Sequence, residues 1–110
     1  MKHYVDMLTF VESPLFTRLA PHYLSDEEYA ELQRFLIMYP KVGKVVSGSG
    51  GVRKLRWKSQ SKGKRGGLRV IYYLRTSAGK IWLLTLYSKT KKSNIPPHIL
   101  RAIKKEMDDD

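Results

Sequence analysis

Apolar positions in the first quarter of the chain change from a loose period of two to helical spacing. Residues 4–12 alternate and are rich in β-forming side chains, which predicts a first strand. Ser13 and Pro14 then offer a helix start, since proline fits the first helical position, and Pro21 limits this helix to a few turns. The chain is therefore expected to open with a strand that runs directly into a short helix.

A second helix is indicated by a capping box. The Ser25 hydroxyl is placed to accept from the third helical N–H group, and Glu28 to reach back to the serine amide. Apolar residues follow at helical spacing up to Pro40: Tyr29, Leu32, Phe35, Leu36 and Tyr39.

Beyond residue 41 the pattern predicts strands at 52–58, 68–75 and 80–88, joined by turns at 47–51, 59–67 and 77–79. Alternation places Lys54, Arg56 and Lys58 on one face of the first strand, and Arg53, Leu55 and Trp57 on the other. In the second strand, one face carries Leu68, Val70, Tyr72 and Leu74. The other face carries Arg69, Ile71, Tyr73 and Arg75. The third strand is a nearly continuous apolar run, which is typical of a central strand buried on both faces.

A C-terminal helix is predicted after Pro96 and Pro97, with a buried stripe of Ile99, Leu100, Ile103 and Met107. The element order predicts an α+β fold: an N-terminal strand and helices packed on a small twisted antiparallel sheet, with a C-terminal helix. At 110 residues with 42% apolar side chains and no internal repeat, the chain is expected to be one domain over 1–110, ending in a flexible acidic tail at 107–110.

Charge is distributed very unevenly. The chain has 21 Lys and Arg against 10 Asp and Glu, for a net charge of +11, and residues 41–105 contain eighteen bases and no acid. Such a stretch cannot neutralise itself through internal ion pairs, so its field extends to an external polyanion, with nucleic acid as the leading candidate. A merely solubilising surface is the alternative, although solubility does not require acids to be excluded from half the chain.

Several classes of site are excluded or disfavoured by inspection. The chain has no cysteine, which removes disulfides, thiol nucleophiles and cysteine metal sites. Neither glycine-rich stretch completes a phosphate-binding loop or a dinucleotide fingerprint. The three histidines, His3, His22 and His98, lack metal-ligand spacing. No cofactor or metal is expected, and without a bilayer-spanning segment or a secretory signal the protein is expected in the cytoplasm.

What remains is a set of basic side chains on and around the sheet, expected to converge on one patch that binds successive phosphates. It comprises Lys54, Arg56, Lys58, Lys62, Lys64, Arg65, Arg69, Arg75, Lys89, Lys91 and Lys92. Tyr73 and Tyr87 are equally placed for the core or for stacking on a base, whereas Trp57 and Trp82 alternate with apolar neighbours and are expected in the core.

Three blocks of sequence together resemble the RelE/ParE superfamily of bacterial toxins, and within it the HigB-type branch. They are residues 52–57 (VRKLRW), 66–73 (GGLRVIYY) and 86–92 (LYSKTKK), and the resemblance spans about residues 5–105. It implies the α+β fold above and cleavage of messenger RNA in the ribosomal A site. The implied partners are the 70S ribosome, its messenger RNA and a cognate antitoxin that keeps the toxin inactive; the free toxin is expected to be a monomer.

Matched position by position, Lys54 and Arg56 stand at the basic residues of the family's central strand and Arg69 at the arginine of the next strand. Lys89, Lys91 and Lys92 stand where the family has further basic groups. Some members use a tyrosine beyond this last cluster, or histidine and aspartate, but residues 93–110 here contain no tyrosine.

The implied chemistry is attack of a ribose 2′-hydroxyl on the adjacent phosphorus. Arg69 is expected to clamp the phosphate, because a guanidinium fork matches two phosphoryl oxygens. Lys54 is expected as general base, because neighbouring cations favour a neutral amine, with Arg56 and Lys91 completing the catalytic set. Two alternatives remain: a ParE-type gyrase inhibitor and a non-catalytic RNA- or ribosome-binding module.

Overall fold

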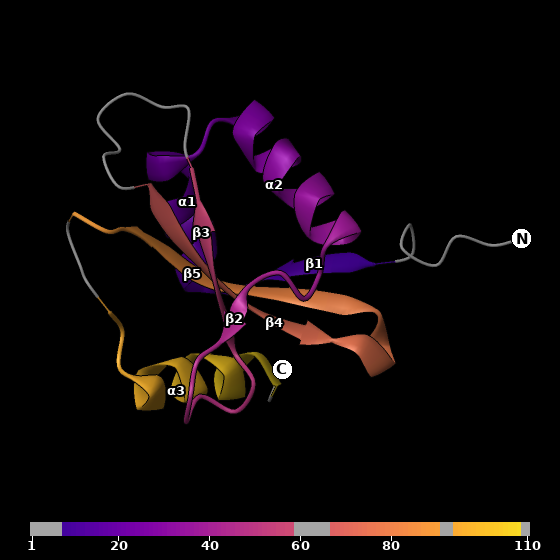
Figure 1. Ribbon diagram of the computed structural model, residues 1–110, viewed down its shortest axis with the longest axis vertical. Coiled ribbons are helices and arrows are strands. Elements are labelled where there is room, and N and C mark those ends of the chain that lie inside the picture. Colours follow the sequence, from indigo (N-terminus) through magenta and orange to yellow (C-terminus); the bar gives the residue numbers. More distant parts are fainter. Residues whose placement is uncertain (1–7, 59–66, 91–93, 109–110) are drawn as a thin grey trace, which may run out of the picture.

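The computed structural model (Figure 1) describes residues 8–58, 67–90 and 94–108. In chain order the elements are β1 (Thr9–Glu12), α1 (Pro14–Tyr23), α2 (Asp26–Met38), β2 (Lys44–Val45), β3 (Arg53–Trp57), β4 (Leu68–Arg75), the 3-10 helix η2 (Thr76–Ala78), β5 (Lys80–Ser88) and α3 (Pro97–Asp108). The predicted α+β class and element order are confirmed. The two-residue β2 is an addition, since so short a strand shows no alternation in the sequence.

The strands form one sheet in the order β1-β5-β4-β3-β2. The three long strands β3, β4 and β5 pair antiparallel, as expected, and β2 joins the edge beside β3 in the same sense. β1 pairs with β5 in parallel, with Thr9 opposite Lys80, so the sheet is mixed. Parallel pairing requires a long connection, which the intervening helices and strands supply.

The pairing of β4 with β5 contains a bulge. Ile71 lies opposite Thr85 and Tyr72 opposite Leu83, which leaves Leu84 without a partner in the register. An extra residue reverses the faces of everything that follows it along the strand. Thus Trp82 and Tyr87, five positions apart, both belong to the core on the α3 side of the sheet.

The first core lies between the sheet and helices α1 and α2. It contains Phe16, Ala20, Leu24, Leu32, Leu36, Leu55, Leu68, Val70, Tyr72, Ile81, Leu83 and Leu86. Both helices are capped as predicted: Ser13 accepts from the Phe16 N–H, and Ser25 and Glu28 complete the capping box. Tyr39, the last of the apolar residues at helical spacing, is 55% exposed because it is the C-cap residue, where the helix has already ended.

The second core lies on the opposite face, beneath α3, and contains Val52, Ile71, Trp82, Leu84, Tyr87 and Leu100. Figure 1 shows α2 and α3 on opposite sides of the sheet, so helices cover both of its faces. Within the predicted stripe of α3, Leu100 is buried, and Ile103 and Met107 pack at its edge. Ile99 is 42% exposed, so its placement in the stripe was wrong: it stands one position from Leu100, about 100° around the helix.

The C-terminal helix includes the start of the expected acidic tail. Met107 packs against the second core, and Asp108 forms an ion pair with Arg75 at 2.8 Å. Residues 109 and 110 lie outside the described part of the chain. Among the described residues, no helix is long and apolar enough to cross a lipid bilayer.

Candidate functional site

Three residues of neighbouring strands form a row across the α3 side of the sheet. Arg56 of β3 lies opposite Arg69 of β4, and Arg69 lies opposite Tyr87 of β5. Residues paired in this way share one face of the sheet, with their Cβ atoms about 5 Å apart. Two arginines directly opposite each other repel, so this arrangement favours an anion bound at the row.

Arg69 is held close to the protein surface rather than extended into solvent. Its side chain is 6% exposed, and one guanidinium nitrogen donates to the Leu68 carbonyl oxygen at 3.3 Å. A guanidinium presents its donors in a rigid planar fork, a shape that matches the oxygens of an anion. Arg56 is exposed, so the pair joins a fixed cation to an accessible one.

Tyr87 is the third member of the row and is also 6% exposed. Burial raises the pKa of its hydroxyl above the ordinary value of 10.0, and the nearby charge of Arg69 partly opposes that rise. The hydroxyl therefore stays protonated at neutral pH and can donate a hydrogen bond. Because the ring packs in the second core, the structure favours its role as a donor beside Arg69 over base stacking.

Lys54 lies on the same strand and face as Arg56, two residues away. Its Nζ donates to the Oδ1 of Asn94 at 3.0 Å. Asn94 was missed at the sequence level, because nothing in its local pattern shows that a residue forty positions away reaches β3. A neutral acceptor holds the ammonium group in place without bringing a negative charge to the site.

Two further predicted cations flank the row. Lys58 directly follows β3 and Lys89 directly follows β5, and both side chains are exposed. The Lys89 backbone N–H donates to the Gly67 carbonyl oxygen at 3.4 Å, which ties the end of β5 to the start of β4. The structure thus brings together Lys54, Arg56, Lys58, Arg69, Tyr87 and Lys89 at one end of the three long strands.

Tyr73 and Arg75 share this face but lie further along β4, under α3. The Tyr73 ring packs at 5.6 Å from the Trp82 ring, and the Lys104 ammonium lies 4.1 Å from the Tyr73 ring centroid. The Arg75 guanidinium lies 5.1 Å from the Trp82 ring and pairs with Asp108. Neither residue therefore joins the row. The remaining predicted residues, Lys62, Lys64, Arg65, Lys91 and Lys92, lie outside the described part of the chain.

The two tryptophans pack as expected. Trp82 belongs to the second core, and Trp57 packs against the first core with its ring 5.6 Å from that of Phe35. The Trp57 Nε1 is buried without a hydrogen-bond partner among the described residues.

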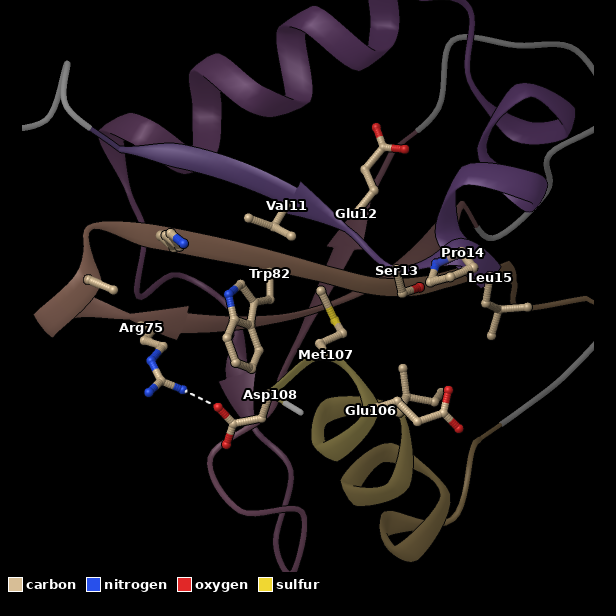
Figure 2. Close-up of a pocket in the computed structure, with 13 residues that line it drawn as sticks. Val11, Glu12, Ser13, Pro14, Leu15, Arg75, Trp82, Glu106, Met107 and Asp108 are labelled. Atoms are coloured by element: carbon tan, nitrogen blue, oxygen red, sulfur yellow. Dashed lines mark hydrogen bonds and ion pairs between the residues drawn. The ribbon is translucent and has the colours of Figure 1, made fainter. Parts of the chain in front are cut away.

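A cavity of about 930 Å³ lies away from the row, between β1, η2 and the end of α3 (Figure 2). Apolar side chains form part of its lining, and Figure 2 shows Trp82 and Met107 side by side there. Of the charged groups that line it, Arg75 pairs with Asp108, and Glu12 accepts hydrogen bonds from Thr17 and Tyr29. Its lining carries charges of both signs, whereas the row carries positive charge alone, so the row is the stronger candidate for binding a polyanion. Among the described residues no cluster of histidine and carboxylate side chains is suited to a metal ion.

No protein-family model matches the sequence. Among solved structures, the chain is similar to a mutant of the Escherichia coli toxin RelE in the free state, with a TM-score of 0.61 and 10% sequence identity, over 88% of this chain and 96% of that chain. At this identity the likeness concerns the fold. The expected architecture is thereby confirmed: the chain has the RelE-like α+β fold, with its basic row on the sheet face that α3 partly covers.

Proposed function

We propose that this protein is the toxin of a type II toxin–antitoxin pair, of the HigB type, and that it cleaves messenger RNA in the A site of the ribosome. The observation that carries the proposal is the Arg56–Arg69–Tyr87 row with Lys54 beside it, on a RelE-like fold. The 41–105 segment supplies every one of these residues and contains no carboxylate to compete with a phosphate.

The row matches what cleavage by an internal 2′-hydroxyl needs. The 2′-oxygen bonds to phosphorus and loses its proton, and the bond to the 5′-oxygen breaks, which leaves a 2′,3′-cyclic phosphate and a 5′-hydroxyl. Arg69 and Arg56 hold the nonbridging oxygens and stabilise the charge that develops on them. This fixed geometry also helps to place the 2′-hydroxyl in line with the leaving group.

Proton transfer and a further hydrogen bond are assigned to three other groups. Lys54, held by Asn94, takes the 2′-hydroxyl proton. The protonated Tyr87 hydroxyl donates a hydrogen bond to the phosphate. Lys91 completes the set by giving a proton to the departing 5′-oxygen. Lys58 and Lys89 contact flanking phosphates, and the 62–65 cations extend this contact to the ribosome.

An antitoxin is the natural regulator of such a surface. The eighteen bases of residues 41–105 attract polyanions without selectivity, so a resting cell must cover or block them. The proposal places the toxin in the cytoplasm, where ribosomes and messenger RNA meet.

Primer extension on a defined messenger tests the proposal, with purified protein added to translating ribosomes or to naked RNA. We expect cuts in A-site codons with ribosomes only, and products ending in a 2′,3′-cyclic phosphate. RNA binding without cuts would show a binding module instead. If neither cuts nor RNA binding occur, inhibition of gyrase is the activity to assay.

A further inference from the structure

A basic groove of about 450 Å³ lies between α3 and the turn at 47–51. Figure 1 shows the chain between β2 and β3 lying against α3. The helix contributes four nitrogen-bearing side chains to the groove: His98, Arg101, Lys104 and Lys105. The turn contributes Ser49 and Gly50. This groove is distinct from the row, and none of its residues belongs to the proposed catalytic set.

Two of the cations are fixed in place by the turn. Arg101 donates to the Gly48 carbonyl oxygen, and Lys104 Nζ donates to that of Gly50 at 3.0 Å. Gly48 and Gly50 have φ values of 78° and 77°, a backbone conformation that glycine adopts readily. Because the turn already orders these long side chains, an anion that binds them loses less side-chain entropy than at a free lysine.

The other two basic side chains are open to solvent. His98 and Lys105 are exposed, and neither makes a hydrogen bond or ion pair within the described ranges. The acid that lines the groove, Asp108, is engaged by Arg75 at 2.8 Å. The groove therefore combines anchored cations, accessible ones and a neutralised carboxylate, which suits a ligand with several negative charges.

We infer that this groove binds consecutive phosphodiesters of a polynucleotide strand. The inference rests on the proposed function in taking that strand to be RNA. His98, the first groove residue along α3, follows Asn94 by four residues, and Asn94 contacts Lys54 of the candidate site. One strand can then engage both surfaces, with α3 carrying the part of the RNA that is not cut.

The test compares two charge reversals of the same size. Lys105→Glu changes the groove without removing a contact that holds the turn. Arg34→Glu changes an exposed residue of α2, on the other side of the sheet. The probe is a fluorescent 2′-O-methylated RNA of about 12 nucleotides, which resists cleavage and spans a typical single-strand site. Its Kd is measured by anisotropy between low and moderate salt.

We expect Lys105→Glu to weaken binding about tenfold and to lower the slope of log Kd against log salt by about 1, as for the loss of a phosphate contact. Arg34→Glu is expected to change Kd less than about twofold. Equal losses in the two variants would overturn the inference, because only net charge would then matter. It would also be overturned if inorganic tripolyphosphate displaced the RNA at equimolar concentration, since the groove would then be a site for small anions.

Cleavage by the same two variants separates this inference from the proposed function. If the wild type cuts RNA on ribosomes but the two variants bind RNA equally well, the groove inference fails and the proposed function stands. If nothing is cut while Lys105→Glu alone loses binding, the groove is upheld and the proposed function fails.

Discussion

Arg69 and Tyr87 face each other across β4 and β5 only because Leu84 is an extra residue in β5. Counted by strict alternation from Trp82, Leu86 and not Tyr87 would lie on the α3 side of the sheet. The bulge reverses this order and brings a protonated hydroxyl to the buried guanidinium. β-Bulges are enriched next to active sites, where they redirect a side chain in this way.

Ser13 connects this bulge to the first helix. Its Oγ accepts from the Phe16 N–H at 2.9 Å and donates to the carbonyl oxygen of Leu84, the bulged residue, at 2.6 Å. We expect Ser13→Ala to lower the free energy of unfolding by about 2 kcal/mol, because it removes a helix cap and leaves a buried carbonyl unpaired. Urea denaturation measures the loss. Ser25→Ala removes a helix cap but no bond to the bulge, so we expect it to lose less stability than Ser13→Ala; equal losses would contradict a contribution from the bond to Leu84.

Gly67 fixes the approach of β4 to β3 beside the row. Its φ is 72°, and an added Cβ would lie 2.8 Å from the Trp57 carbonyl oxygen. Because that neighbour is backbone and cannot rotate away, we expect Gly67→Ala to destabilise the fold by about 1 to 3 kcal/mol. Thermal denaturation checks this. A Tm equal to that of the wild type would show that the strands separate here without cost.

Two buried tyrosines and one half-buried tyrosine predict a loss of stability at alkaline pH. Burial raises the pKa values of Tyr29, Tyr72 and Tyr87 above 10.0, and in Tyr29 the hydrogen bond and charge of Glu12 raise it further. Above pH 10 the unfolded chain loses these protons while the folded chain keeps them, so the free energy of unfolding falls as pH rises. Below pH 10 this contribution to stability is fully present.

Urea denaturation at about pH 9 and about pH 11 measures this fall, which we expect to exceed about 1 kcal/mol. Tyr29→Phe removes the largest shift, so its stability should decline less between the two pH values. An equal decline in Tyr29→Phe and the wild type would contradict the assignment to Tyr29.

Asn94 is expected to act by positioning Lys54. Asn94→Ala removes the acceptor that holds the Lys54 Nζ, and we expect the rate of RNA cleavage at saturating ribosomes to fall about tenfold, because a misplaced base loses much of its effect. Single-turnover kinetics separates this fall from any change in KM. Asn94→Gln retains an amide acceptor and should recover part of the rate; no difference between the two variants would exclude positioning through this oxygen.

The sequence predicted the features that local rules govern. The capping box at Ser25, the helix start at Ser13 and the alternation that puts Arg56 and Arg69 on one face all follow from residue type and spacing, and the structure confirms each of them. The direct pairing of Arg56 with Arg69 depends in addition on the register of β3 and β4, which alternation alone does not predict.

Features that depend on the tertiary arrangement could not be predicted in this way. The parallel pairing of β1 depends on where two helices return the chain, and the bulge at Leu84 is hidden inside an apolar run that suits either face. The sequence pattern places Tyr73 and Tyr87 equally for the core or for base stacking. In the structure, however, α3 and its Lys104 cover Tyr73. The contact of Asn94 with Lys54 likewise requires the position of α3.

The central claim is that the row, and not the basic charge of the sheet in general, cuts RNA. The most direct measurement is the rate of messenger cleavage on translating ribosomes by the variants Arg69→Ala and Arg75→Ala. Both variants remove one positive charge from the same face of β4. Circular dichroism checks that each variant is folded. We predict a loss of at least about 100-fold for Arg69→Ala, as for removal of a group that stabilises the transition state, and less than about threefold for Arg75→Ala. Equal rates in the two folded variants would contradict the claim.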